Sequence, residues 1–155
     1  MKAIILASGN GLRFLPLSKT NPKPLTKLLG KSIIEHNLEN LKGIVDEVFI
    51  VIGYLGDKIK KTIGNNYNDI KITYIIDDEI VGTGNSARLA ISKINDDKVI
   101  IMNGDDLYSK EDIKALIKKC PSIAVKKVSN PSSFGIVTIQ NEKVIQIEEK
   151  PQNPK

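Results

Sequence analysis

Short runs of aliphatic residues alternate along the chain with segments whose apolar side chains recur at helical spacing. The uninterrupted runs predict strands that are buried in a sheet. Apolar residues at every third or fourth position predict amphipathic helices, and Ser32 with Glu35 has the pattern of a capping box. The predicted strands are Lys2–Ala7, Glu47–Ile52, Lys71–Ile76 and Lys98–Met102, and the predicted helices are Ser32–Leu41, Gly56–Ile63, Thr83–Ile94 and Ser109–Lys119.

The last third of the chain has a different pattern. Three further strands are predicted over Ser122–Val128, Gly135–Ile139 and Lys143–Glu149, and the last two alternate as in a hairpin around Asn141-Glu142. Because strands alternate with helices before this point, we expect an α/β fold of three layers, α/β/α, around a mostly parallel sheet. The late hairpin is expected to make that sheet mixed.

Composition agrees with one folded domain that has an aliphatic core. Hydrophobic residues make up 41% of the 155 residues, aromatic residues make up 5%, and Trp is absent. One Cys excludes an internal disulfide and a multi-cysteine zinc site. No apolar run reaches the roughly 18 residues of a transmembrane helix. The N-terminal apolar run is too short for a signal peptide, so we expect a cytoplasmic protein with no membrane partner.

The charge distribution argues against a nucleic-acid partner. The formal net charge is +5, but nearly all basic residues are Lys, and Arg13 and Arg88 are the only arginines of the sequence. The lysines are mixed with acidic residues, as in Asp57–Lys61. Nucleic-acid binders more often cluster arginines and aromatic residues on one face. We therefore interpret the basic residues as a solvated surface.

Polar or glycine-rich segments follow several of the predicted strands. They are Ser8–Pro24, Gly82–Asn85, Asn103–Asp106 and the loop after Glu149. In an open α/β sheet, ligands bind outside the carboxyl ends of the strands. Convergence of these segments on one edge therefore predicts a single ligand site.

The first of these segments has the features of a phosphate-binding loop. Gly9-Asn10-Gly11 directly follows a strand, so its backbone N–H groups can approach an anion closely. It is neither a P-loop nor a dinucleotide fingerprint, because the further residues of those motifs are absent. Arg13 can bind phosphate oxygens in a bidentate manner. Lys23 lies between two prolines, which stiffen the loop that carries this cation. The alternative is a proline-rich turn with an incidental lysine.

Two carboxylates end a predicted buried strand. Asp105 and Asp106 lie next to the expected phosphate site, and Mg²⁺ is commonly held by one or two carboxylates together with substrate oxygens. Asp105, directly after Gly104, is the better candidate for the metal. The alternative is a structural turn or helix cap.

Together these segments resemble the signature of the sugar-phosphate nucleotidyltransferases, also called nucleotide-sugar pyrophosphorylases. The resemblance rests on Leu6–Leu17, Pro22–Leu25, Gly82-Thr83-Gly84, Asn103-Gly104-Asp105, Phe134–Val137 and Glu148–Pro151. It implies a Rossmann-like nucleotidyltransferase fold and the Mg²⁺-dependent reaction of a nucleoside triphosphate with a sugar-1-phosphate, giving an NDP-sugar and pyrophosphate. The sugar phosphate attacks the α-phosphorus directly, so catalysis consists of positioning and charge neutralisation.

The resemblance also implies roles for individual residues. Arg13 would steady the leaving pyrophosphate, Lys23 would neutralise the α-phosphate, and Lys150 would contact the phosphate of the sugar; these three are the predicted catalytic residues. Asp105 would bind Mg²⁺. The predicted nucleotide-binding residues are Leu6, Ala7, Ser8, Gly9, Asn10, Gly11, Arg13, Lys23, Asp77, Gly82 and Thr83, and the predicted sugar-phosphate-binding residues are Asn103, Gly135, Glu149 and Lys150.

The sequence departs from the family pattern in two ways. Ser8 stands where the family loop has a second Ala, and Leu12 stands where it has Thr. Family members also continue well past the Glu-Lys-Pro segment, with elements that complete the sheet and sugar pocket and carry a second metal-binding Asp or Asn. We therefore interpret residues 1–155 as a nucleotidyltransferase catalytic domain that lacks its C-terminal portion. An oligomer is compatible with this interpretation.

Two alternative functions compete with this interpretation. One is a cytidylyltransferase for a small alcohol phosphate of the phosphocholine type. The other is a non-catalytic nucleotide-binding or regulatory domain of the same fold. The presence of Arg13, Lys23, Asp105 and Lys150 argues against the non-catalytic domain.

Asp77 gives the only sequence-based expectation about the base. It occupies the position, five residues before the Gly-Thr turn, where many uridylyl and thymidylyl members of the family carry Gln. An ionised carboxylate only accepts hydrogen bonds, so it suits the amino group of cytosine better than O4 of uracil or thymine. If Asp77 faces the base, CTP is preferred. If it points to solvent instead, backbone groups read the base.

Overall fold

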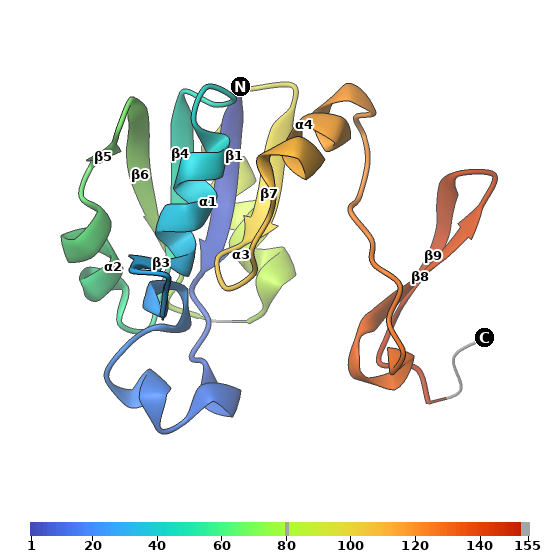
Figure 1. The fold of residues 1–155 in the computed structure, drawn as a ribbon, viewed down its shortest axis with the longest axis horizontal. Helices are drawn as coiled ribbons and strands as arrows, with labels where there is room; N and C mark the ends of the chain where they lie inside the picture. The colour runs from blue at the N-terminus through green and yellow to red at the C-terminus, as the bar shows by residue number, and fades with distance from the viewer. Residues whose placement is uncertain (80, 153–155) are drawn as a thin grey trace. The chain divides into compact units, whose positions relative to one another are not determined.

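A five-stranded sheet forms the centre of the larger part of the protein. The computed structural model describes residues 1–79 and 81–152, and the chain divides into two compact units, 1–121 and 122–155. In the first unit the strand order is β5-β6-β4-β1-β7 (Figure 1). Four strands are parallel, and the short β5 pairs antiparallel with β6. The strands of this sheet are β1 (Lys2–Ala7), β4 (Glu47–Ile52), β5 (Asn66–Tyr67), β6 (Ile70–Ile76) and β7 (Val99–Asn103).

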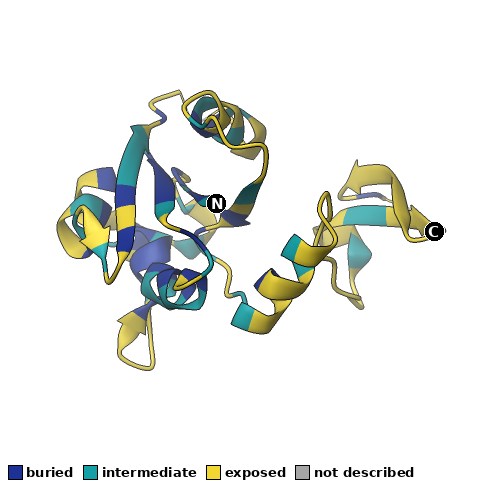
Figure 2. Ribbon diagram, turned by 90° about the horizontal axis from the view of Figure 1, so that it is seen from above, coloured by how far each residue is buried: buried dark blue, intermediate teal, exposed yellow. Residues whose placement is uncertain are grey.

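Helices cover both faces of this sheet. The helices are α1 (Ile33–Leu41), α2 (Gly56–Ile63), α3 (Thr83–Ile91) and α4 (Lys110–Lys118). Successive side chains of a strand point to opposite faces. Ile5 of β1 therefore joins one core cluster with α1, α2 and α4, whereas Ile4 joins a second cluster with Ala90 of α3. Buried residues accordingly line the sheet and the inner sides of the helices (Figure 2). The predicted α/β/α fold with a mixed, mostly parallel sheet is confirmed.

Local sequence signals placed several elements correctly. The strands Lys2–Ala7 and Glu47–Ile52 and the helix Gly56–Ile63 have the predicted bounds. The capping box is also present, because the Ser32 backbone N–H donates to Glu35 Oε2 at 2.8 Å and the Glu35 backbone N–H donates to Ser32 Oγ at 3.4 Å. These features depend on neighbours within one turn or one strand, which a sequence pattern records directly.

The connections of the first unit contain short elements. The phosphate-loop segment is folded into the 3₁₀ turns η1 (Leu12–Phe14), η2 (Leu17–Lys19) and η3 (Lys23–Leu25). A small antiparallel hairpin of β2 (Lys27–Leu28) and β3 (Lys31–Ser32) leads into α1. None of the helices in the described part of the chain has the length and apolarity needed to cross a lipid bilayer.

The second unit corrects two predictions. It consists of the 3₁₀ turn η4 (Pro131–Ser133) and a two-stranded antiparallel sheet of β8 (Gly135–Gln140) and β9 (Lys143–Glu149). The hairpin is thus a sheet of its own, and β5 makes the main sheet mixed. Ser122–Val128 is not a strand. A strand needs a hydrogen-bonding neighbour, and no described strand pairs with this segment, whose residues are exposed.

Candidate active site

Three of the four polar segments come together at one edge of the main sheet. Ser8–Pro24 follows β1, the Gly82–Asn85 turn lies between β6 and α3, and Asn103–Asp106 ends β7. The strands are parallel and in register, with Leu6 paired with Asn103, so these segments leave the sheet at the same edge. The fourth segment, after Glu149, belongs to the second unit and is described with it below.

The structure brings Lys23 and Asp105 into an ion pair. The Lys23 Nζ atom lies 2.6 Å from Asp105 Oδ2, although the two residues are 82 positions apart in sequence. Pro24 and Leu25, which follow Lys23 in η3, are buried and anchor this turn to the core. The two side chains remain 40% and 38% exposed, so both are accessible to a ligand.

A glycine lets the Asp105 loop pass closely against β1. The Gly104 backbone N–H donates to the Leu6 carbonyl oxygen at 2.8 Å. A Cβ atom at position 104 would lie 2.9 Å from the same oxygen, closer than side chains normally approach a backbone. This contact fixes the position of the loop that carries Asp105 relative to the end of β1.

Two asparagines of α1 donate hydrogen bonds to the same loop. Asn37 Nδ2 donates to the Asp106 carbonyl oxygen and Asn40 Nδ2 donates to the Tyr108 carbonyl oxygen, each at 2.8 Å. Asn37 is fully buried. Neither residue is among the site residues predicted from the sequence. The available signal was an amide at position 37 on the apolar face of a predicted amphipathic helix, where burial costs free energy unless hydrogen bonds compensate.

The sugar-site candidate Asn103 belongs to this loop network. Its backbone N–H donates to the Tyr108 hydroxyl at 3.1 Å, and its side chain donates to Asp106 Oδ2 at 3.1 Å. Burial raises the pKa of the Tyr108 hydroxyl above its ordinary value. The Tyr108 hydroxyl oxygen is the acceptor for the Asn103 N–H. The Asp106 carboxylate is thus engaged within the loop, in contrast to Asp105, which faces Lys23.

The glycine loop after β1 presents backbone donors. Gly9 and Asn10 are exposed, and no described residue accepts a hydrogen bond from either backbone N–H. Farther along, the loop is fastened to the start of α2, where the Tyr54 hydroxyl donates to the Lys19 carbonyl oxygen at 3.4 Å. Arg13 lies exposed in η1. The arrangement leaves two amides and a guanidinium available to an anion.

The remaining nucleotide-site candidates differ in exposure. Leu6 packs against the core cluster on the α3 face, and Ala7 is buried in the core on the other face, so these two residues offer a ligand mainly their backbone. Gly82 and Thr83 are exposed at the beginning of α3.

Asp77 is buried, which overturns the alternative that it points to solvent. The residue is 1% exposed, and Ser86 Oγ donates to its Oδ2 atom. Ser8 Oγ lies 3.5 Å from the same oxygen. Direct contact of Asp77 with a base stays a prediction.

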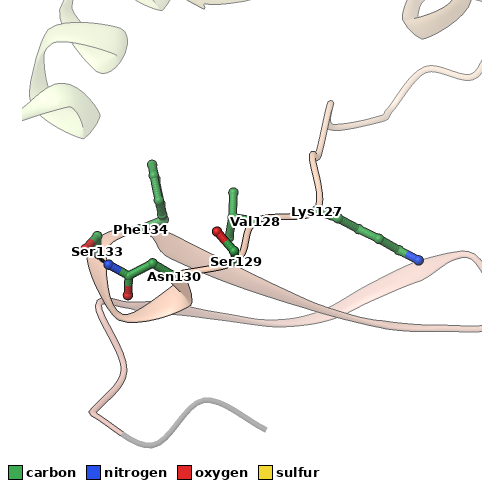
Figure 3. A pocket seen from close by; sticks show the side chains of 6 residues that line it. All are labelled: Lys127, Val128, Ser129, Asn130, Ser133 and Phe134. Carbon is green, nitrogen blue, oxygen red and sulfur yellow. Dashed lines mark hydrogen bonds between the residues drawn. The ribbon is translucent and has the colours of Figure 1, made fainter.

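The second unit brings together the other sugar-phosphate candidates. Gly135 is paired with Glu149 in the hairpin register. The Lys150 backbone N–H donates to the Phe134 carbonyl oxygen at 3.0 Å, and Lys150 Nζ lies 3.5 Å from Glu149 Oε1. A wide, shallow cavity of about 450 Å³ lies within the same unit (Figure 3). It is lined by Lys127, Val128, Ser129, Asn130, Ser133 and Phe134.

The carboxylate of Asp105 would bind Mg²⁺ only together with oxygens of the substrate. The described residues contain no cluster of three or more His, Cys, Asp or Glu side chains that could enclose a metal ion. Mg²⁺ keeps several waters and is usually bound through one or two carboxylates and substrate phosphates. A single accessible carboxylate such as Asp105, beside a phosphate-binding loop, suits that mode of binding.

Comparison with known proteins decides the family. A family model described as nucleotidyl transferase matches residues 2–155. The chain belongs to the nucleotidyl transferase family. The resemblance recognised in its motifs to the sugar-phosphate nucleotidyltransferases is thereby confirmed.

Individual relatives support this assignment. The chain is 36% identical to the bifunctional protein GlmU of Methanocaldococcus jannaschii, over all of the chain and 37% of GlmU. It is 31% identical to the D-glycero-alpha-D-manno-heptose 1-phosphate guanylyltransferase of Aneurinibacillus thermoaerophilus, over 97% of the chain and 68% of that protein. The chain therefore spans little more than a third of GlmU but about two thirds of the guanylyltransferase.

A solved structure has the same fold. A Bacillus anthracis protein assigned as a glucose-1-phosphate thymidylyltransferase, solved in complex with a sucrose, superimposes with a TM-score of 0.86. The two sequences are 28% identical, and the match covers 99% of this chain and 66% of that one. This agreement confirms the Rossmann-like nucleotidyltransferase fold.

Proposed function

We propose that this chain carries the nucleotide site of a sugar-1-phosphate nucleotidyltransferase, which forms an NDP-sugar and pyrophosphate. The ion pair between Lys23 and Asp105 carries the proposal. It brings the predicted phosphate-neutralising cation within 2.6 Å of the predicted metal ligand, at the edge of the sheet where the glycine loop begins. Relatives named for heptose 1-phosphate and glucose-1-phosphate support a sugar-1-phosphate as the acceptor.

The proposed reaction is a direct displacement at phosphorus. A phosphate oxygen of the sugar-1-phosphate forms a bond to the α-phosphorus of the nucleotide. The bond from that phosphorus to the bridging oxygen of the β-phosphate breaks, and pyrophosphate leaves with the electron pair. Negative charge grows on the leaving group, so the largest contribution of the protein is fixed positive charge and N–H donors aimed at the phosphates.

Three groups of the first unit divide this task. The backbone N–H groups of Gly9 and Asn10 bind phosphate oxygens of the triphosphate, and Arg13 steadies the departing pyrophosphate. Lys23 neutralises the α-phosphate, and its ion pair with Asp105 keeps the ammonium group at the site before the nucleotide arrives. When bound, Mg²⁺ would be held by Asp105 and phosphate oxygens, and it would supply further charge neutralisation.

The roles in sugar-phosphate binding come from the resemblance to the family. In the second unit Lys150 is assigned to the phosphate of the sugar, and Gly135 and Glu149 are assigned to the sugar. Asn103 of the first unit stays a candidate for sugar binding by itself. The two relatives are named for different bases, guanine in one and thymine in the other. We infer that residues outside the motifs common to the family select the base.

Pyrophosphate release tests the proposal. The full-length protein is incubated with Mg²⁺ and one of ATP, CTP, GTP, UTP or dTTP, with and without glucose-1-phosphate, mannose-1-phosphate or N-acetylglucosamine-1-phosphate. At least one pair is expected to release pyrophosphate and form an NDP-sugar in equal amounts. Release that does not depend on the sugar phosphate, or no release from any pair, would contradict the proposed reaction.

A further inference from the structure

Three buried polar side chains from distant segments meet beneath the glycine loop. They are Asp77, Ser8 and Ser86, and their exposed fractions are 1%, 6% and 2%. Ser86 Oγ donates to Asp77 Oδ2, Ser8 Oγ lies 3.5 Å from the same oxygen, and the two hydroxyl oxygens are 3.1 Å apart. The cluster is closed to solvent and lies within the first unit.

The cluster joins the segments that would hold a nucleotide. Ser8 is the first residue after β1 and opens the phosphate-binding loop. Ser86 lies in the first turn of α3, where its hydroxyl also approaches the Gly82 carbonyl oxygen at 3.3 Å. Asp77 follows β6, and its backbone N–H donates to the Ile52 carbonyl oxygen of β4 at 2.8 Å. One carboxylate therefore links the loop after β1 to the turn that begins α3.

The backbone around this cluster is packed without spare room. Gly53, at the end of β4, lies between the segments that follow β1 and β6. A Cβ atom at position 53 would lie 2.9 Å from the carbonyl oxygens of both Ser8 and Asp77. Tight backbone packing on one side and hydroxyl–carboxylate hydrogen bonds on the other hold Ser8 in one position.

Burial of a carboxylate costs free energy, because the group loses its hydration by water. Hydrogen bonds within the protein must compensate for that loss. Here hydroxyl groups supply that compensation on one oxygen. The other oxygen, Asp77 Oδ1, is buried with no hydrogen-bond partner among the described residues. A carboxylate that reads a base must present an accessible oxygen, whereas the Asp77 side chain is buried and its Oδ2 atom is hydrogen-bonded to Ser86 and Ser8.

We propose that Asp77 is a positioning residue, whose buried carboxylate fixes the start of the phosphate-binding loop to helix α3 through Ser8 and Ser86 and thereby preorganises the triphosphate site. This rests on the proposed function. Preorganisation strengthens binding because the loop loses less freedom when the ligand arrives. The role is independent of the base, so it differs from the base recognition expected for this position from the sequence.

Inorganic tripolyphosphate separates the two roles because it has no base. Its affinity for the full-length protein is measured by calorimetry for the wild type, for Asp77→Asn and for Ser8→Ala. Each substitution is expected to weaken tripolyphosphate about tenfold, the effect of losing one good hydrogen bond. The double variant is expected to be no weaker than Asp77→Asn alone, because both substitutions break one network. Asp78→Asn removes the same charge from an exposed neighbouring residue and is the matched control.

A nucleotide panel completes the test. Asp77→Asn is expected to weaken CTP, GTP, UTP and dTTP by the same factor, with KM raised and kcat at saturation nearly unchanged. Unchanged tripolyphosphate affinity, or a change in base preference with CTP most affected, would overturn the positioning role and favour base reading. If the wild type binds neither tripolyphosphate nor any nucleotide, the proposed function itself fails. If Asp77→Asn does not fold, as judged by circular dichroism, Ser8→Ala carries the test alone.

Discussion

Replacing Lys23 by Ala should separate catalysis from stability. Lys23 Nζ pairs with Asp105 at 2.6 Å, but the two side chains are 40% and 38% exposed. Exposed ion pairs contribute about 0.2–1 kcal/mol to stability, so the free energy of unfolding should change by no more than about 1 kcal/mol. A group that stabilises charge developing in the transition state contributes about 3–4 kcal/mol, so kcat should fall by about 10²- to 10³-fold.

The chain offers a matched control for this substitution. Lys31 pairs with Glu39, and these side chains are 49% and 37% exposed, close to the values for Lys23 and Asp105. This second pair joins β3 to α1 and has no place in the proposed reaction. Lys31→Ala should therefore have the same small effect on stability and leave turnover unchanged.

Two measurements on the full-length protein show whether Lys23 acts in catalysis or in stability. They are steady-state pyrophosphate release and thermal unfolding of the wild type and both variants. The expected pattern is a large loss of kcat for Lys23→Ala alone, with similar melting temperatures for the two variants. Equal turnover in Lys23→Ala and Lys31→Ala would refute the assigned role of Lys23. A fall in melting temperature specific to Lys23→Ala that accounts for the lost activity would show that the lysine is structural.

Three other substitutions test separate features of the structure. Asp105→Asn should raise the Mg²⁺ concentration needed for half-maximal activity and lower the rate. If the Mg²⁺ dependence is unaltered and the free energy of unfolding falls by about 1 kcal/mol, Asp105 is a structural cap instead. Gly104→Ala should lower the free energy of unfolding by about 1–3 kcal/mol in urea titration, because the new Cβ would lie 2.9 Å from the Leu6 carbonyl oxygen. An unchanged urea midpoint would show that the loop moves freely. Burial opposes ionisation of Glu47, but hydrogen bonds from Lys71 and Thr73 and the nearby charges lower the pKa of its carboxyl below 4.5 overall. Its stabilising effect should therefore be complete above that pH and fade as the pH falls, so the difference in melting temperature between wild type and Glu47→Gln should be largest near neutral pH and shrink in acid.

The sequence by itself determined the features that depend on near neighbours. Uninterrupted aliphatic runs located the parallel strands, and Ser32 with Glu35 located the start of α1, because both signals act within a strand or a helical turn. The glycine loop, Lys23 between prolines and Asp105 after a strand were also visible, since each is a local arrangement. These local motifs, taken in order, were enough to place the chain in its family.

Only the tertiary structure decided which polar groups face one another. The environment of a side chain depends on strand order. In the order β6-β4-β1-β7, Asp77 lies within hydrogen-bonding distance of Ser8, and Asp105 lies beside Lys23. Residues 77 and 8 are 69 positions apart, so no local pattern relates them. The burial of Asn37 was missed, and a strand was wrongly predicted over Ser122–Val128, for the same reason. The hydropathy of a residue indicates the free energy that it would gain from burial. The packing of distant segments decides whether the residue is buried and which groups form hydrogen bonds with it.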